Sequence, residues 1–106
     1  MGKSQRTKGR RGKTAAAHLL KDRDWNIIET SAGMKVEDIV ATDQQGKSWS
    51  IEVKNHKIIK IEEFRKQAIE QAKARGIDWM LMIKIACTSS WLIWQKGKRP
   101  VVWGEK

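Results

Sequence analysis

The chain has 106 residues, with 22 Lys and Arg against 12 Asp and Glu, and a formal net charge of +10. This length predicts one domain with a hydrophobic core and little room for a second module. The hydrophobic fraction of 40% excludes a wholly disordered basic tail. The positive excess indicates an anionic partner, with nucleic acid as the first candidate.

The cysteine and histidine counts exclude other classes of protein. The single cysteine, Cys87, cannot form an internal disulfide, and two histidines do not suffice for the usual Cys/His zinc site. These features favour a reducing, cytoplasmic compartment. The most apolar stretch, residues 77–86, contains Asp78 and Lys84 and is too short for a bilayer, so we expect no membrane partner. The basic N-terminus precedes no long apolar segment, so we expect no secretory signal.

The first 13 residues hold much of the positive excess. Their basic residues, which no acidic residue accompanies, are Lys3, Arg6, Lys8, Arg10, Arg11 and Lys13. With three glycines and almost no apolar residue, this segment predicts a flexible basic arm before a single domain over residues 14–106. The arm either contacts nucleic-acid phosphates, with strong salt dependence, or is a solvated tail without function.

The first half of the domain predicts one helix and three strands. Thr14 can cap a helix over residues 15–21, and residues 25–30 are rich in strand formers. Residues 31–33 form a small-residue loop. Strands over 36–42 and 48–54 are joined by residues 43–47, which suit a hairpin connection.

After Asn55 the hydrophobic period becomes helical, with the apolar residues Ile61, Phe64, Ala68 and Ala72 on one face. This pattern predicts a helix over residues 60–75 that ends at Gly76. Residues 78–85 predict a buried central strand, and residues 90–95 and 101–103 predict a hairpin. The order α-β-β-β-α-β-β-β predicts an α/β domain with one mixed sheet flanked by helices.

Three charged residues interrupt the predicted hairpin. Glu52 and Lys54 share one strand face, and the turn can bring Asp38 beside Glu52. Two carboxylates with the carbonyl of Val53 offer the hard oxygen ligands that Mg²⁺ or Mn²⁺ prefers. Lys54 can then position a water or stabilise phosphate charge, which suits metal-assisted phosphodiester hydrolysis. The alternative is an exposed strand face with a cross-strand ion pair.

These residues, in the order Glu37-Asp38, thirteen residues, Glu52-Val53-Lys54, resemble the motif of the PD-(D/E)XK nuclease superfamily. The similarity is greatest to archaeal-type and phage-encoded Holliday junction resolvases. It extends from residues 8–11 through 30–33, the motif and the helix over 60–75 to Trp91. Glu37 stands where the superfamily name has proline.

The resemblance implies a restriction-endonuclease-like fold and a homodimer that nicks four-way DNA junctions with Mg²⁺, in recombination or repair in a phage or prokaryotic host cell. It implies that Asp38 and Glu52 bind metal, that Lys54 acts on the attacking water and that Ser31 lies near the scissile phosphate. The expected DNA contacts are Lys8, Arg10, Arg11, Lys13 and Lys57.

One family feature is missing from the sequence. The first helix of these enzymes usually adds a glutamate to the metal site, but residues 14–18 contain no carboxylate. Either His18 takes part instead, or the site uses fewer protein ligands. His18 is otherwise a partly buried structural residue. His56 is either a phosphate contact or a solvated loop residue, and Gln67 is either a site residue or an ordinary surface glutamine.

The six tryptophans predict both core and surface roles. Trp25 and Trp79 flank apolar strands and are expected in the core, and Cys87 is expected to be a small buried residue. Trp91 and Trp94 are three residues apart and therefore lie on opposite strand faces. Aromatic residues near Met80 and Met82 could form a dimer interface, or could stack on unpaired bases.

The sequence therefore predicts a Mg²⁺-dependent endonuclease acting on branched DNA. One alternative is a nuclease of the same chemistry that acts on flaps, nicks or duplex DNA. The other is a basic nucleic-acid-binding module without catalysis, in which Asp38 and Glu52 are structural.

Overall fold

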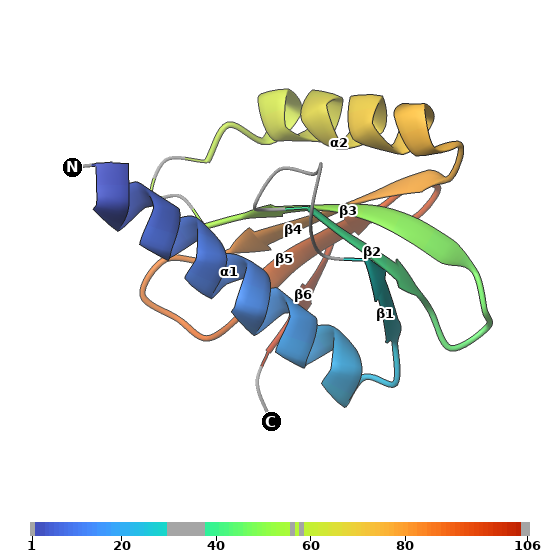
Figure 1. Cartoon of the computed structure of the whole chain (residues 1–106), viewed down its shortest axis with the longest axis horizontal. Helices are drawn as coiled ribbons and strands as arrows, with labels where there is room; N and C mark the ends of the chain where they lie inside the picture. Colours follow the sequence, from blue (N-terminus) through green and yellow to red (C-terminus); the bar gives the residue numbers. More distant parts are fainter. Residues whose placement is uncertain (1, 30–37, 56, 58, 105–106) are drawn as a thin grey trace.

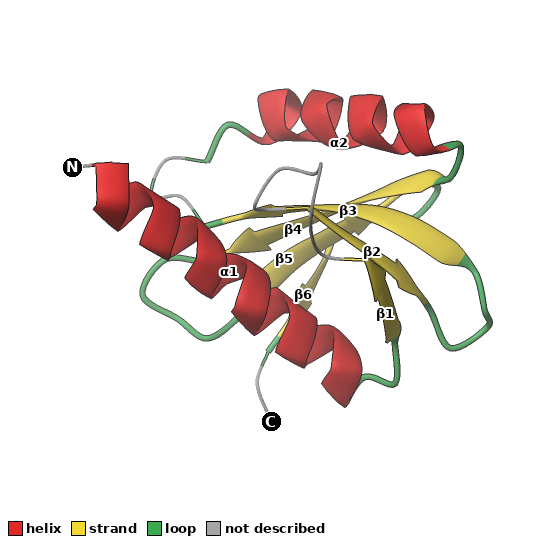
Figure 2. Cartoon of the chain, viewed as in Figure 1, coloured by secondary structure: helices red, strands yellow, loops and turns green. Residues whose placement is uncertain are grey.

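The computed structural model describes residues 2–29, 38–55, 57 and 59–104. In chain order its elements are α1 (Gly2–Asp22), β1 (Asn26–Glu29), β2 (Asp38–Thr42), β3 (Ser48–Lys54), α2 (Ile61–Arg75), β4 (Asp78–Lys84), β5 (Trp91–Gln95) and β6 (Val101–Trp103). This order confirms the predicted α/β class, with one mixed sheet and flanking helices (Figure 2).

The sheet keeps its six strands in chain order, β1-β2-β3-β4-β5-β6. Every neighbouring pair is antiparallel except β3 and β4, which are parallel and joined by the α2 crossover. Figure 1 shows α1 and α2 on opposite faces of the sheet. Because β3 and β4 are parallel, their carboxyl ends meet at one edge of the sheet, where Gly12 of α1 contacts Asn55 and Phe64 of α2 lies beside Lys54.

Two apolar clusters, one on each face, hold the helices to the sheet. On the α1 face, Ala16 and Leu20 pack in the cluster that contains Ile51, Val53 and Met80. On the α2 face the cluster comprises Phe64, Ala68, Ala72, Trp79, Leu81 and Ile83. The alternation of side chains along β3 and β4 explains why neighbouring residues belong to different clusters.

Gly76 and Asp43 form the turns that end α2 and connect β2 to β3. Gly76 takes the left-handed conformation at φ 70° and ends α2, with its N–H bonded to carbonyls of the last helical turn. In the β2–β3 turn, Asp43 Oδ1 accepts the backbone N–H groups of Gln45 and Lys47 at 2.9 and 3.0 Å. These two bonds order the turn between the strands.

The expected start of the first helix at Thr14 is wrong, because α1 begins at Gly2. Residues 2–13, which we expected to form an arm without regular structure, are helical. The glycines indicated a flexible segment, but Gly12 is buried in the helix, and a Cβ there would lie 3.0 Å from the Cβ of Asn55. Gly12 thus allows close packing inside a helix. The flexibility of this segment stays a prediction.

The burial of the tryptophans agrees with the sequence, whereas that of the methionines and the cysteine differs from it. Trp25 and Trp79 are buried as expected, and Trp91 and Trp94 belong to opposite faces. Met80 and Met82 are fully buried, so they contribute no side-chain surface to the predicted dimer interface. Cys87 is exposed rather than buried, in a turn where its φ is 62°.

Candidate active site

The β2–β3 hairpin brings the two motif carboxylate positions together. The backbone register pairs Asp38, the first residue of β2, directly with Glu52 near the end of β3. Lys54 follows two residues later and ends the strand. Residues paired across an antiparallel ladder have Cβ atoms about 5 Å apart. The predicted hairpin and its pairing are therefore present in the backbone.

Glu52 and Lys54 form a buried ion pair on the α2 face. The Lys54 ammonium lies 3.3 Å from Glu52 Oε1, and the side chains are 9% and 0% exposed. Lys54 also lies over Phe64 of α2, with its Nζ 5.3 Å from the ring centroid. The strand face that carries Glu52 and Lys54 is thus buried, which differs from the exposed face that the sequence offered as an alternative.

Two contacts fix the direction of α2 across β3. Arg75, at the end of α2, donates a hydrogen bond to Ser50 Oγ, whereas Phe64 in the first half of α2 lies beside Lys54. The helix therefore runs opposite to β3, and its middle crosses the level of Glu52. Gln67 lies in this middle part, and its Oε1 is buried without a hydrogen-bond partner among the described residues.

The oxygen ligands of this end of the sheet suit a hard cation. Glu52 supplies a buried carboxylate. Val53, whose carbonyl is the other candidate ligand on β3, lies one residue beyond the last described pair of the β2–β3 ladder. With a second carboxylate at position 38, this donor set fits Mg²⁺ or Mn²⁺. No group of three or more His, Cys, Asp or Glu side chains suited to a metal occurs among the described residues, whose side chains do not include that of Asp38.

Helix α1 approaches the motif at Gly12, against Asn55, which directly follows Lys54. This contact precedes residues 14–18, the stretch in which the resemblance predicts an additional glutamate. The first acidic residue of the whole chain is Asp22, at the far end of this helix. The helix thus supplies no carboxylate near the motif.

The remaining candidate residues are dispersed. Lys57 is exposed just after the motif, and Lys13 is half-buried on α1. His18 is exposed and belongs to the helix on the opposite sheet face from Glu52, so its interpretation as a partly buried residue is wrong. Ser31 and His56 lie outside the described residues, as do the side chains of Lys8, Arg10 and Arg11.

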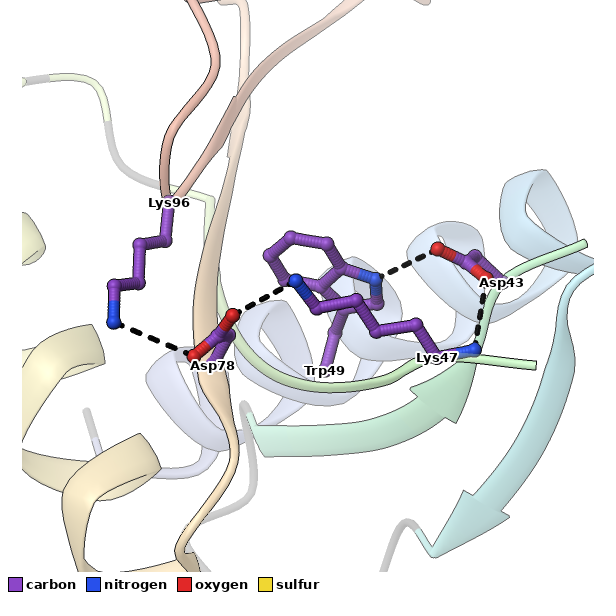
Figure 3. A network of polar contacts seen from close by, with 5 residues as sticks. All are labelled: Asp43, Lys47, Trp49, Asp78 and Lys96. Carbon is purple, nitrogen blue, oxygen red and sulfur yellow. Dashed lines mark hydrogen bonds and ion pairs between the residues drawn. The ribbon is translucent and has the colours of Figure 1, made fainter. Parts of the chain in front are cut away.

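A second polar network, which sequence reasoning missed, lies at the opposite end of β3 (Figure 3). Asp78 binds Lys47 at 2.8 Å and Lys96 at 3.5 Å, and the Trp49 indole donates to Asp43 Oδ2 at 3.1 Å. The Lys47 ammonium also lies 4.4 Å from the centroid of the Trp49 ring. In the sequence, the only sign of this network is that residues of opposite charge lie at or next to the ends of strands.

This network lowers the pKa of both of its carboxyl groups. Burial raises the pKa of Asp43, but hydrogen bonds from Trp49, Lys47 and Gln45 outweigh it and hold the pKa below its ordinary value. The hydrogen bond from Lys47 lowers the pKa of Asp78. Both groups are therefore ionised near neutral pH, and the Lys47–Asp78 ion pair joins the β2–β3 turn to the start of β4.

Comparison of the chain with protein-family models, curated proteins and solved structures finds no match. The resemblance to PD-(D/E)XK nucleases therefore stays a prediction carried by the motif and the element order. Within the described part of the chain, neither helix has the apolar length needed to cross a bilayer.

Proposed function

We propose that this chain is a divalent-metal-dependent DNA endonuclease with a restriction-endonuclease-like fold. The observation that carries the proposal is the register of Asp38 against Glu52, with Lys54 3.3 Å from the Glu52 carboxylate. Two acidic positions and a lysine at one strand end give the residue types needed for metal-assisted phosphodiester hydrolysis. Acids close to a bound phosphate would repel the DNA backbone unless a cation lies between them.

In this proposal Asp38, Glu52 and the carbonyl of Val53 hold Mg²⁺, for which Mn²⁺ can substitute. The bound ion supplies a water of lowered pKa and positive charge beside the phosphate. Lys54 holds the attacking water and stabilises negative charge on the phosphate, and Phe64 orients its ammonium through the cation–π contact. Ser31, Lys57 and the basic residues of α1 hold the DNA backbone, and Gln67 supports the site from α2.

The substrate in this proposal is branched DNA. A homodimer gives so small a chain a two-fold symmetry that matches the symmetry of a four-way junction. Flaps, nicks and plain duplex are the alternative substrates for the same chemistry. No base-reading element is evident in the sequence, so substrate shape rather than base sequence would decide the preference.

The test is cleavage of labelled four-way junction, flap and linear duplex in Mg²⁺, Mn²⁺ or EDTA. We expect symmetric junction cuts that need the metal and fall about a hundredfold or more in Asp38→Asn and Lys54→Met. Glu70→Gln, which removes an exposed carboxylate of α2, is the matched control and should cut as the wild type does. Junction binding without cleavage in either metal would refute the nuclease proposal.

One observation favours a second candidate, a nucleic-acid-binding module without catalysis. Glu52 and Lys54 pair with each other inside the protein, where a phosphate must displace neighbouring groups to reach them. In that case the pair is structural, and Asp38→Asn binds junction DNA as the wild type does with no cleavage to lose. The same assay therefore separates the two functions.

A further inference from the structure

A groove of about 900 Å³ opens between α1 and the β4–β5 loop, on the sheet face opposite Glu52. The helix side of the groove is formed by Ala15, His18, Leu19 and Asp22. The other side is formed by Lys84, at the end of β4, and by loop residues that include Cys87, Ser89 and Ser90. None of these residues has a role in the proposed metal site.

The groove contains hydrogen-bond donors that have no partner among the described residues. The Lys84 ammonium and the hydroxyls of Ser89 and Ser90 make no hydrogen bond or ion pair with any described residue. Thr88 differs, because its hydroxyl donates to the carbonyl of Ile85 at 2.9 Å and accepts the N–H of Ser90. This bonding holds the loop, and the neighbouring serines are left to bind a ligand.

Charge favours an anion at one end of the groove. Among the described residues that line it, Asp22 alone is acidic, and it ends α1, one helical turn beyond His18. The helix carries no acidic residue before Asp22, and helix geometry puts positions 8 and 11, both basic, in line with Ala15 and His18. An anionic chain would therefore lie toward Lys84 and the first half of α1.

The groove and the proposed active site meet at the same edge of the sheet. The parallel register pairs Lys54 with Ile83, so Lys84 lies one residue further, level with Asn55. Successive residues alternate between faces, so Lys54 points to the α2 side and Lys84 to the α1 side. In α/β sheets ligands bind beyond the carboxyl ends of the strands, and the two lysines flank that position on β3 and β4.

We propose that this groove is a second phosphate-binding site that holds the DNA backbone through Lys84, Ser89 and Ser90, across the sheet edge from Glu52 and Lys54. The inference rests on the proposed function in one respect, that the chain binds DNA, and it does not depend on cleavage. A strand that crosses this edge contacts both faces, which lets a small domain hold DNA on two sides of the cutting position.

Cys87, the single cysteine of the chain, is exposed in this groove and reports directly on its occupancy. The experiment measures the rate at which the neutral reagent N-ethylmaleimide modifies Cys87, by intact mass, with and without saturating fluorescein-labelled four-way junction. EDTA is present throughout to prevent cleavage, and fluorescence anisotropy gives the bound fraction. We expect DNA to slow modification several-fold.

Variants show which residues hold the DNA. Lys84→Gln should weaken binding about fivefold to tenfold and reduce the slope of log K against log salt by about 0.9, the value for one phosphate contact. Ser89→Asp, in an exposed loop, should weaken binding further by repulsion. Lys73→Gln makes the same charge change on α2, far from the groove, and should leave protection of Cys87 unchanged.

The outcomes separate this inference from the proposed function. Protection without cleavage supports the groove and refutes the nuclease. Cleavage with unprotected Cys87, and with Lys84→Gln binding as the wild type does, refutes the groove and leaves the nuclease. The absence of DNA binding refutes both.

Discussion

The two faces of β3 are equally buried and chemically opposite. Trp49, Ile51 and Val53 project into an apolar core against α1, and each is 1% exposed or less. Glu52 and Lys54 project toward α2 and are 1% and 7% exposed. Position in the sheet cannot explain the difference, because the same strand contributes both sets of side chains.

This difference bears on what each face does for the protein. The α1 face stabilises the fold through burial of apolar surface, at roughly 25 cal/mol per Å². A buried ion pair must overcome the loss of hydration of both groups, and apolar replacements are often neutral or more stable. The charges of the α2 face are therefore poorly explained by stability, and a function is the simpler reason for them.

The largest effect on stability is expected when the ion pair is broken on one side only. Lys54→Met removes the ammonium beside the buried Glu52 carboxylate and should lower the free energy of unfolding by about 3–5 kcal/mol. Urea denaturation followed by circular dichroism measures the loss.

The matched control removes both charges. The double variant Glu52→Leu with Lys54→Met should be about as stable as the wild type, or more stable by about 1–4 kcal/mol. Under the nuclease proposal it should also cut no DNA. A double variant less stable than Lys54→Met alone would mean that the α2 face is maintained for stability, which would contradict the comparison.

A similar effect is expected on the apolar face, for a different reason. Ile51→Ala leaves a cavity beneath α1 and should cost about 2–5 kcal/mol of unfolding free energy. Ile28, whose exposed fraction is 54%, gives a control, since Ile28→Ala should change stability by no more than about 0.5 kcal/mol. Equal losses in the two variants would show that Ile51 is not part of a tight core.

A smaller effect is expected where α1 meets the end of β3. Gly12→Ala gains about 0.5–1 kcal/mol of helix propensity but forces a methyl group against Asn55, for which overpacking costs about 1–3 kcal/mol. We expect a net loss of about 1 kcal/mol in urea denaturation.

Removal of the opposing Cβ tests the cause. In the Asn55→Gly background, Gly12→Ala should be neutral or stabilising, since the contact between the two Cβ atoms no longer exists. A loss of the same size in both backgrounds would place the strain elsewhere and would remove the packing explanation for this glycine.

Strands and turns were the most predictable part of this molecule. β3 occupies the predicted residues, and Gly76 ends α2 as expected, because alternation and a left-handed cap are local properties of the sequence. The pairing of Asp38 with Glu52 also followed from the sequence, because the short turn over residues 43–47 leaves few registers.

Tertiary contacts explain what the sequence did not reveal. Gly12 is one of the three glycines that predict a flexible arm, and only the position of Asn55 shows why a helix accommodates a glycine there. The burial of Glu52 and Lys54 was not predictable from the sequence, because nothing local to β3 indicates that α2 covers that face. The groove beside Lys84 joins α1 to a loop more than sixty residues away, beyond the reach of any local pattern.

The smallest effect is expected at the far end of β3, where the surface network of Asp43 and Asp78 lies. Both have a pKa below the ordinary value, so the folded protein holds their protons less tightly than the unfolded chain does. Their contribution is therefore complete above the unfolded pKa of about 3.9 and is lost as the pH falls through the lower folded values.

The melting temperature of the wild type should fall more steeply below about pH 4 than that of the double variant Asp43→Asn with Asp78→Asn. Since exposed pairs contribute little, this shift should be smaller than any of the others. Identical acid profiles would show that the network orders the turn without stabilising the fold.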